Sequence, residues 1–440
     1  MTPKRLIRLL SSPLYITLFA FALRMVLVAH NWYAMQVPAR AIVPYGYELG
    51  RVASAIAGGL GFSSPLRLVD SGSSAWFTPV YPYLVAGIFK IWGIYSDKSK
   101  LIIETLNCAC ASLTVIPIFE IAKRTFRKSV ATGAAWAWVF LPTSLLFPIW
   151  WIWDTALAGL ILALIFWATL AIRDSRSVWR WAGYGALWAL GVLTNPSMMS
   201  LLPFLAGWAV WETRRNSINW ARFGTTAALI FAICLIPWTV RNYRTFGKVI
   251  VLRSNFGLEL WLGNNPDVPD TWTPWLHPND NQEEADKYKR MGEIAYMEQK
   301  EHEAFAFIRT HPSDTLQFMF RRFVENWLAV TESPVDSWPG SPLYVKAFVV
   351  MNFLLTLFTW LGALFAYRSR LSESFPYAMV LLIFPLVFYL THASLRYRFP
   401  MDPIMMVLAA YGVAEPIRQW LERSNAQAGA AAPAPPVPTA

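Results

Sequence analysis

The chain has 440 residues, of which 55% are hydrophobic and only 15% are charged, and its formal net charge is +11. Soluble domains usually carry about 25% charged residues, so this composition excludes an ordinary cytosolic enzyme, a disordered chain and a disulfide scaffold. The Lys and Arg residues stand in short groups between apolar runs instead of clustering on one soluble face. That distribution argues against a nucleic-acid partner and indicates loops held at a membrane surface.

Apolar runs in the sequence predict the transmembrane helices. About ten runs reach or nearly reach the ~20 residues that a spanning helix needs. In chain order they are roughly 13–31, 101–122, 130–150, 154–172, 181–196, 199–212, 223–240, 344–366, 375–392 and 401–416. We therefore predict an all-α polytopic membrane protein with about ten transmembrane helices.

Basic groups predict the side of the membrane on which each loop lies, because cytoplasmic loops carry an excess of Lys and Arg. Such groups occur near residues 4–8, 123–128, 173–180, 214–222, 368–370 and 418–423. All of these basic groups are cytoplasmic only if the short apolar run at 79–94, which contains Lys90, does not cross the membrane. We therefore expect 79–94 to be a juxtamembrane or re-entrant helix on the outer side. The alternative is a miscount of two helices elsewhere.

This topology divides the chain into four parts. Residues 1–240 form a transmembrane module whose first outer loop, 31–100, holds an interfacial helix. Residues 241–343 form a small outer-side segment, and 344–423 form the last transmembrane helices. The Ala- and Pro-rich end, 424–440, is predicted to be a disordered cytoplasmic tail.

Two acidic residues on the outer side are candidates for catalysis. Glu48 opens the interfacial helix, where its carboxylate suits a general base; alternatively, it caps the helix and pairs with Arg51. Asp154 falls at the short outward turn between two long apolar runs, so we expect it to lie near the first outer loop. Interfacial carboxylates are functional candidates by default, although an N-cap of the next helix suits Asp154 equally well.

Four arginines stand on the outer side, where the charge bias of membrane proteins disfavours them: Arg241, Arg244, Arg396 and Arg398. Guanidinium groups bind phosphate through paired hydrogen bonds, so a phosphate at the outer leaflet explains their position, with lipid head groups as the alternative. A further arginine, Arg24, lies within the first span and either reaches outward or is paired inside the protein. The five histidines show no metal-ligand spacing. The metal requirement stays open, and one of the two acids could hold a divalent cation.

Several short motifs carry a resemblance to a known superfamily. They are Gly59-Leu-Gly61-Phe62, Thr78-Pro-Val-Tyr-Pro82, Leu193-Thr-Asn195-Pro196, Pro237-Trp-Thr-Val-Arg241-Asn242 and Arg396-Tyr-Arg398-Phe-Pro400. In this order they resemble the bacterial GT-C membrane glycosyltransferases, the superfamily of protein O-mannosyltransferases and aminoarabinose transferases. The resemblance covers most of residues 1–265 and the last two spans.

The resemblance implies a multi-pass protein of the bacterial inner membrane that transfers a sugar, with inversion, from a polyprenyl-phosphate donor. The acceptor, on the periplasmic side, is a protein, a lipid or a glycan. Glu48 and Asp154 are then the catalytic acids, and the four outer arginines bind the donor phosphate. The family usually has an acid about one turn before Glu48 and a basic residue in place of Asn195. The alternatives are a transporter or flippase of a lipid-linked substrate and a non-catalytic GT-C-like subunit.

Overall fold

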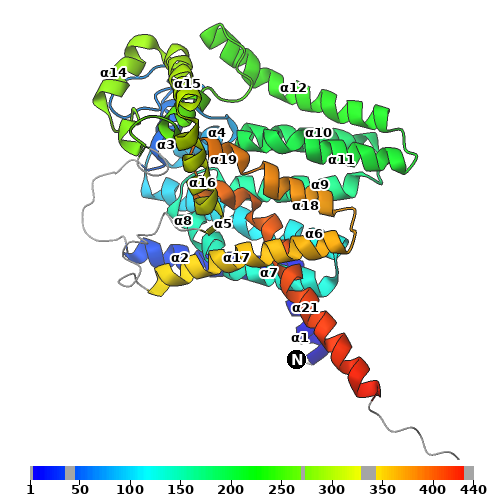
Figure 1. Ribbon diagram of the computed structural model, residues 1–440. Helices are drawn as coiled ribbons and strands as arrows, with labels where there is room; N and C mark the ends of the chain where they lie inside the picture. Colours follow the sequence, from blue (N-terminus) through cyan, green and yellow to red (C-terminus); the bar gives the residue numbers. More distant parts are fainter. Residues whose placement is uncertain (1–2, 35–44, 269–272, 329–342, 431–440) are drawn as a thin grey trace, which may run out of the picture.

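The computed structural model describes residues 3–34, 45–268, 273–328 and 343–430, and Figure 1 shows their arrangement. Within these ranges the regular elements are helices, and a single β-bridge joins Ser63 to Ser73. Long helices lie side by side in one layer, and shorter helices gather at one end of that layer (Figure 1). The predicted all-α fold is confirmed.

The long helices form the membrane layer. Among the described residues, five helices are long and apolar enough to cross a membrane, or six if the bent pair α7 and α8 forms one span. The five are α2 (Pro13–Ala34), α5 (Asp97–Leu113) continued by α6 (Val115–Thr125), α9 (Thr155–Ile172), α12 (Trp220–Phe246) and α17 (Leu343–Arg368). The bent pair consists of α7 (Lys128–Phe140) and α8 (Pro142–Trp150), which meet at 44°.

The count is lower than the predicted ten because several predicted spans form short helices. α10 (Val178–Thr194) has 17 residues and α11 (Leu202–Arg215) has 14. At 1.5 Å per residue such helices cover about 21–26 Å, less than the ~30 Å hydrocarbon core. The run at 375–392 is divided into α18 (Ser374–Ile383) and α19 (Leu386–Leu390).

The last helix extends further than the sequence analysis predicts. α21 (Asp402–Ala430) is helical through residues 424–430, which were expected to begin a disordered tail. Residues 431–440 lie outside the described residues. α21 packs closely on α17 because Gly362 and Gly412 leave room for the partner backbone at Leu408 and Phe358.

One buried arginine lies in the first span. Arg24 donates to the Ser144 carbonyl at 3.1 Å and to the Ala20 carbonyl at 3.1 Å, and its side chain is fully buried. Buried guanidinium groups are retained only where hydrogen bonds satisfy them. Of the two alternatives for Arg24, the structure shows the internal pairing.

The basic loops meet at one end of the layer. Arg124, in the last turn of α6, forms an ion pair with Asp174, after α9, at 2.9 Å. Arg173 pairs with Glu373, before α18, at 2.8 Å. Asn216, after α11, also donates to Asp174 at 2.9 Å. The 18 residues of α9 span about 27 Å, so Asp154, at its other end, lies a membrane thickness away from these loops.

The opposite end carries a cap of shorter helices, which the two outer segments build together. They are α3 (Tyr47–Ala57), α4 (Val80–Trp92), α13 (Phe256–Gly263), α14 (Gln282–Met291), α15 (Glu293–Thr310) and α16 (Pro312–Leu328). The Glu293 carboxylate accepts from the Ala75 backbone at 2.6 Å, and Ser254 donates to the Ala75 carbonyl at 2.9 Å. α4 has only 13 residues, about 20 Å, so the run at 79–94 is too short to span and packs in the cap.

Candidate active site

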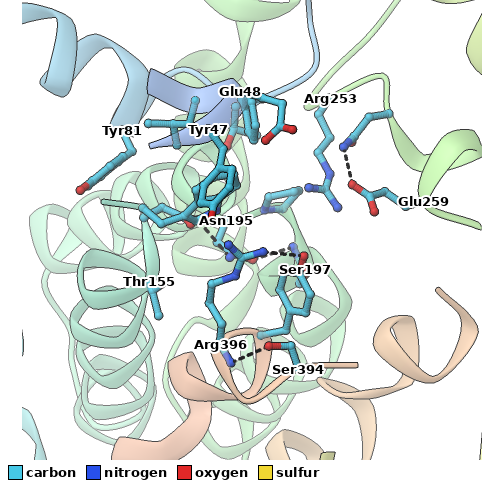
Figure 2. Close-up of a pocket in the computed structure, with 18 of the residues that line it drawn as sticks. Tyr47, Glu48, Tyr81, Thr155, Asn195, Ser197, Arg253, Glu259, Ser394 and Arg396 are labelled. Atoms are coloured by element: carbon cyan, nitrogen blue, oxygen red, sulfur yellow. Dashed lines mark hydrogen bonds between the residues drawn. The ribbon is translucent and has the colours of Figure 1, made fainter. Parts of the chain in front are cut away.

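A cavity of about 490 Å³ opens in the cap, at the ends of the spanning helices opposite to the basic loops. Segments far apart in the sequence form its walls: the start of α3, the turn before α9, the stretch before α13 and the turn before α20 (Leu395–Arg398). Figure 2 shows several of the lining side chains facing one another. The charged side chains and histidines that line the cavity are Glu48, Asp154, Arg253, Glu259, His277, Asp280, Glu325, His392 and Arg396.

Glu48 lies in the first turn of α3, as the sequence predicts, but its carboxylate does not cap that helix. It accepts a hydrogen bond from Asn279 and lies 3.8 Å from the Arg51 guanidinium. Gly46 and Tyr47 both have positive φ, 79° and 46°. A left-handed Tyr is uncommon and costs energy that the surrounding structure must offset. This strained turn directs the Glu48 side chain towards the cavity.

We expect that Gly50→Ala will displace Glu48 and lower activity. Gly50 lies one helical turn after Gly46, and an added Cβ would overlap the Tyr45 carbonyl oxygen. The turn that carries Tyr47 and Glu48 would have to move, and misplacement of about 1 Å near the reacting groups can cost on the order of 10²-fold in rate. Sugar-transfer activity and the midpoint of thermal unfolding, each compared between Gly50→Ala and the unaltered protein, measure this effect.

A matched control for that substitution is Gly87→Ala in α4, because an added Cβ there meets no atom within 4 Å. Gly87→Ala should retain both activity and stability. Full activity in Gly50→Ala would show that the geometry of this turn does not matter to the reaction.

Asp154 occupies the N-cap position of α9 without making a capping hydrogen bond. Its Oδ2 instead accepts from the side-chain amide of Asn195 at 3.1 Å, and Asn195 also holds the backbone of Ser197. Asp154 precedes the first residue of the span. Burial raises the pKa of Asp154 to about 6, while Asn195, Arg396 and Arg253 oppose that rise. At pH 7 the Asp154 carboxyl is therefore mostly ionised, and it becomes half-protonated when the pH falls to about 6.

Two arginines face the cavity. The Arg396 guanidinium lies over the rings of Trp151 and Trp153, 4.8 and 4.6 Å from their centroids, and donates to the Tyr397 hydroxyl at 2.9 Å. Arg253 is partly buried and directs its guanidinium into the cavity (Figure 2). Arg253 makes no hydrogen bond or ion pair within the part of the chain that the structure describes. An unpaired guanidinium beside a second one forms a ready site for an anion.

Arg241 and Arg244 lie away from this cavity, contrary to the prediction. The Arg241 guanidinium donates to the carbonyls of Ser74 and Phe62 at 2.6 and 2.8 Å, and so braces α12 against the first outer loop. Arg244 is exposed and does not line the cavity. The Arg241 guanidinium is therefore bound by backbone carbonyls of the protein itself.

Arg398 also differs from the prediction. It is completely buried, pairs with Asp402 at 3.0 Å and donates to Asn352 at 2.7 Å. Arg396 and Arg398 are two residues apart on the short helix α20, so their side chains point in different directions. Of the four predicted arginines, Arg396 alone lines the cavity.

Three residues that the sequence analysis gave no role connect to Arg396. His392 Nε2 lies 2.8 Å from the Tyr397 hydroxyl, to which Arg396 donates, and His392 Nδ1 lies 3.4 Å from the Glu259 carboxylate. Burial, assisted by Arg396, lowers the pKa of His392 to about 3, so the ring is neutral. This chain of contacts fixes the orientation of Arg396. No spacing in the sequence indicated it, because Glu259 and His392 are joined only by the tertiary fold.

The described part of the structure offers no set of ligands for the divalent cation that one of the two acids could hold. Among the residues that the structure describes, no group of three or more His, Cys, Asp or Glu side chains could hold a metal ion. Glu48 and Asp154 line the same cavity, but their hydrogen-bond partners are the amides of Asn279 and Asn195.

The motifs that carry the resemblance converge on this cavity. Thr78 donates to the Thr194 carbonyl at 2.9 Å, which joins the Thr78–Pro82 motif to the Leu193–Pro196 motif, and Arg396 belongs to a third motif. Residues 77–240 match the sequence model of the dolichyl-phosphate-mannose-protein mannosyltransferase family. A comparison with curated proteins gave no match.

Solved structures of GT-C proteins share the architecture. The oligosaccharyltransferase of Archaeoglobus fulgidus in its apo form has a TM-score of 0.55 and 13% sequence identity, covering 94% of this chain and 52% of its own. The same organism's AglB, in complex with an inhibitory peptide and a dolichol-phosphate, has a TM-score of 0.53 and 14% identity, covering 97% and 52%. The chain has the GT-C fold.

The expected GT-C resemblance is thus confirmed in the fold and, over residues 77–240, in the sequence, and the apolar helices make the chain a multi-pass membrane protein. The chain spans about half the length of the archaeal proteins that it matches. ArnT from Cupriavidus metallidurans bound to undecaprenyl phosphate has a lower TM-score, 0.36, with 11% identity, covering 95% of this chain and 79% of its own.

Proposed function

We propose that this chain transfers a sugar, with inversion, from a polyprenyl-phosphate carrier to a hydroxyl group at the outer surface of a bacterial inner membrane. The observation that carries the proposal is a cavity that brings the carboxylates of Glu48 and Asp154 together with the guanidinium groups of Arg253 and Arg396. The mannosyltransferase family match and the GT-C fold support glycosyltransfer, and the AglB complex with dolichol-phosphate supports a lipid-phosphate ligand. The basic loops at the opposite end support an outward-facing cavity.

The two arginines would bind the phosphate that leaves with the lipid. Arg253 has no partner among the described residues, and Arg396 is held in place by Trp151, Trp153 and Tyr397. When the sugar–phosphate bond breaks, its electron pair stays on the phosphate oxygen, which gains one negative charge. Preorganised positive groups at that position stabilise the developing charge and therefore the transition state.

Glu48 would accept the proton of the acceptor hydroxyl. The acceptor oxygen attacks the anomeric carbon from the face opposite to the phosphate, the carbon–oxygen bond to the phosphate breaks, and the hydroxyl proton passes to Glu48. A single displacement of this kind inverts the configuration at the sugar. Asp154 accepts a hydrogen bond from Asn195 at 3.1 Å, lines the same cavity as the two arginines and forms no ion pair with the residues that the structure describes. We therefore assign it the role of setting the charge around the phosphate.

That role predicts a pH effect on donor binding. Ionised Asp154 repels an anionic donor and is protonated as the pH falls through about 6, so binding should tighten by up to about tenfold between pH 7.5 and 5.5. A short polyprenyl phosphodiester is a suitable probe because its single charge does not titrate in this range. Asp154→Asn should bind the probe more tightly at pH 7.5 and lose most of the pH dependence. Identical pH profiles for the two proteins would contradict this role.

The proposed reaction can be tested with the purified full chain in lipid nanodiscs. A panel of polyprenyl-phosphate hexoses and pentoses, each with a radioactive sugar, is mixed with candidate acceptors. We expect at least one donor to release polyprenyl phosphate in step with labelled product. A chain that moves the labelled lipid across a proteoliposome membrane without cleaving it would be a flippase, and the proposal would fail.

A further inference from the structure

A second cavity, of about 670 Å³, lies on the other side of the Glu48 turn. It shares four lining residues with the first cavity: Tyr47, Glu48, Trp151 and Asp280. Neither Asp154 nor the arginines Arg253 and Arg396 line it. Glu48 therefore stands in the wall between two cavities, of which only one contains the candidate phosphate site.

The second cavity lies at the level of the membrane surface. Asn31 near the end of α2, Lys100 near the start of α5 and Trp150 at the end of α8 all line it. These positions are the outer ends of three spanning segments. The Trp150 side chain is 55% exposed, as is usual for tryptophans at a membrane–water interface. A molecule anchored in the outer leaflet can reach this cavity without leaving the bilayer.

The charges of the second cavity are balanced. Arg67 pairs with Asp280 at 2.7 Å, Arg51 with Glu48 at 3.8 Å and Lys100 with Glu104 at 3.9 Å. An anionic head group would have to compete with a carboxylate for each of these cations, whereas in the first cavity Arg253 has no such partner among the described residues. The second cavity therefore favours an uncharged polar ligand over a phosphate.

The remaining lining groups are those that bind sugars. The side-chain amide of Asn31 offers both donors and an acceptor to a ring bearing several hydroxyl groups, whereas the Asn279 amide is held by Glu48 and the Arg67 backbone. Aromatic side chains offer flat apolar faces to the carbon-bound hydrogens of such a ring; here they are Tyr45, Tyr47, Trp150 and Trp151.

We propose that the second cavity binds the acceptor, and that the acceptor is an uncharged sugar carried on a lipid. The inference rests on the proposed function, because it assigns the second substrate of that reaction. The sugar hydroxyl would reach Glu48 from the second cavity while the donor phosphate occupies the first. The hydroxyl oxygen forms the new bond to the anomeric carbon, its proton passes to Glu48, and polyprenyl phosphate leaves.

Photolabelling of the full chain in nanodiscs tests this assignment without requiring turnover. The probes are a dodecyl disaccharide with a diazirine beside the sugar, its methyl counterpart without the long alkyl chain, and a diazirine-bearing Ser/Thr peptide. Mass spectrometry then locates the labelled residues. We expect the dodecyl disaccharide to label the peptides around residues 149–152 and 100–104, at concentrations well below those required for the methyl glycoside.

Two tryptophans provide a matched pair of variants. Trp150→Ala removes an aromatic face from the cavity and should lower labelling by about tenfold. Trp179→Ala, an 86% exposed residue next to the basic loops, should leave it unchanged. Because both side chains are largely exposed, neither change removes much internal packing.

The other outcomes overturn the proposal. Labelling of these peptides by the Ser/Thr peptide in place of the glycoside would assign the cavity to a protein acceptor. Equal labelling by the methyl and dodecyl glycosides would show that the alkyl chain does not contribute to binding, and the acceptor would then not be a lipid-linked sugar. Labelling confined to the first cavity would refute a separate acceptor site. A photoreactive polyprenyl phosphate, which should label the peptides of Arg253 and Arg396, tests the donor site independently, so failure of the two proposals can be distinguished.

Discussion

Replacing Glu48 by Gln is expected to lower the rate of sugar transfer by about 10²–10⁴-fold, the usual contribution of a general base. Gln has nearly the same size and can remain beside Asn279 and Arg51, but its amide cannot accept a proton at neutral pH. Donor binding should survive, because the proposed phosphate site consists of Arg253 and Arg396. Single-turnover transfer and equilibrium binding of the donor, measured on the same preparation, separate the two effects.

The control for this substitution is Glu283→Gln, which changes an exposed carboxylate on α14 outside both cavities. It should transfer sugar at the rate of the unaltered protein. If Glu48→Gln retained nearly full activity, Glu48 would only be the structural partner of Arg51 and Asn279.

Replacing Arg253 or Arg396 by Gln should weaken donor binding by roughly 10- to 100-fold each. A hydrogen bond to a charged group is worth about 1.5–3 kcal/mol, and every 1.4 kcal/mol is a factor of ten in affinity. The effect of Arg396→Gln includes the loss of its contacts with Trp151 and Trp153. Isothermal titration with a short-chain polyprenyl phosphate measures both affinities, and the double variant should bind more weakly than either single one.

Arg244→Gln provides the comparison, because Arg244 is an exposed arginine at the outer end of α12 that lines neither cavity. Its donor affinity should equal that of the unaltered protein. If Arg244→Gln weakened binding as much as Arg253→Gln, the arginines would attract anionic lipid in general instead of forming a specific phosphate site.

Local sequence features were sufficient to predict part of this molecule. Apolar runs predicted helices throughout, and the start of α3 near Glu48 followed from its amphipathic pattern. The short turn between α8 and α9 placed Asp154 on the same side as the first outer loop, and both acids indeed line one cavity. These predictions succeeded because they depend on periodicity and on short connections, which act over a few residues.

The arginines could not be assigned in the same way. A position outside a span shows that a guanidinium is near the membrane surface, but tertiary packing decides its partner. Arg398 finds Asp402 one turn later, and Arg241 meets two backbone carbonyls of the first outer loop. Arg253 gave no separate signal, because its unpaired state is a property of the folded cavity alone.

The hydrogen bond from Asn279 to Glu48 joins residues 231 positions apart, and this has a consequence for biosynthesis. A nascent chain that has reached residue 240 already contains Glu48 and Asp154, but it lacks Asn279, Arg253 and Arg396. Its spanning helices can enter the bilayer while the proposed phosphate site does not yet exist. With the proposed function, we therefore expect that the incomplete protein neither holds nor cleaves a lipid-linked sugar, and that activity begins only when the second outer segment packs against the first.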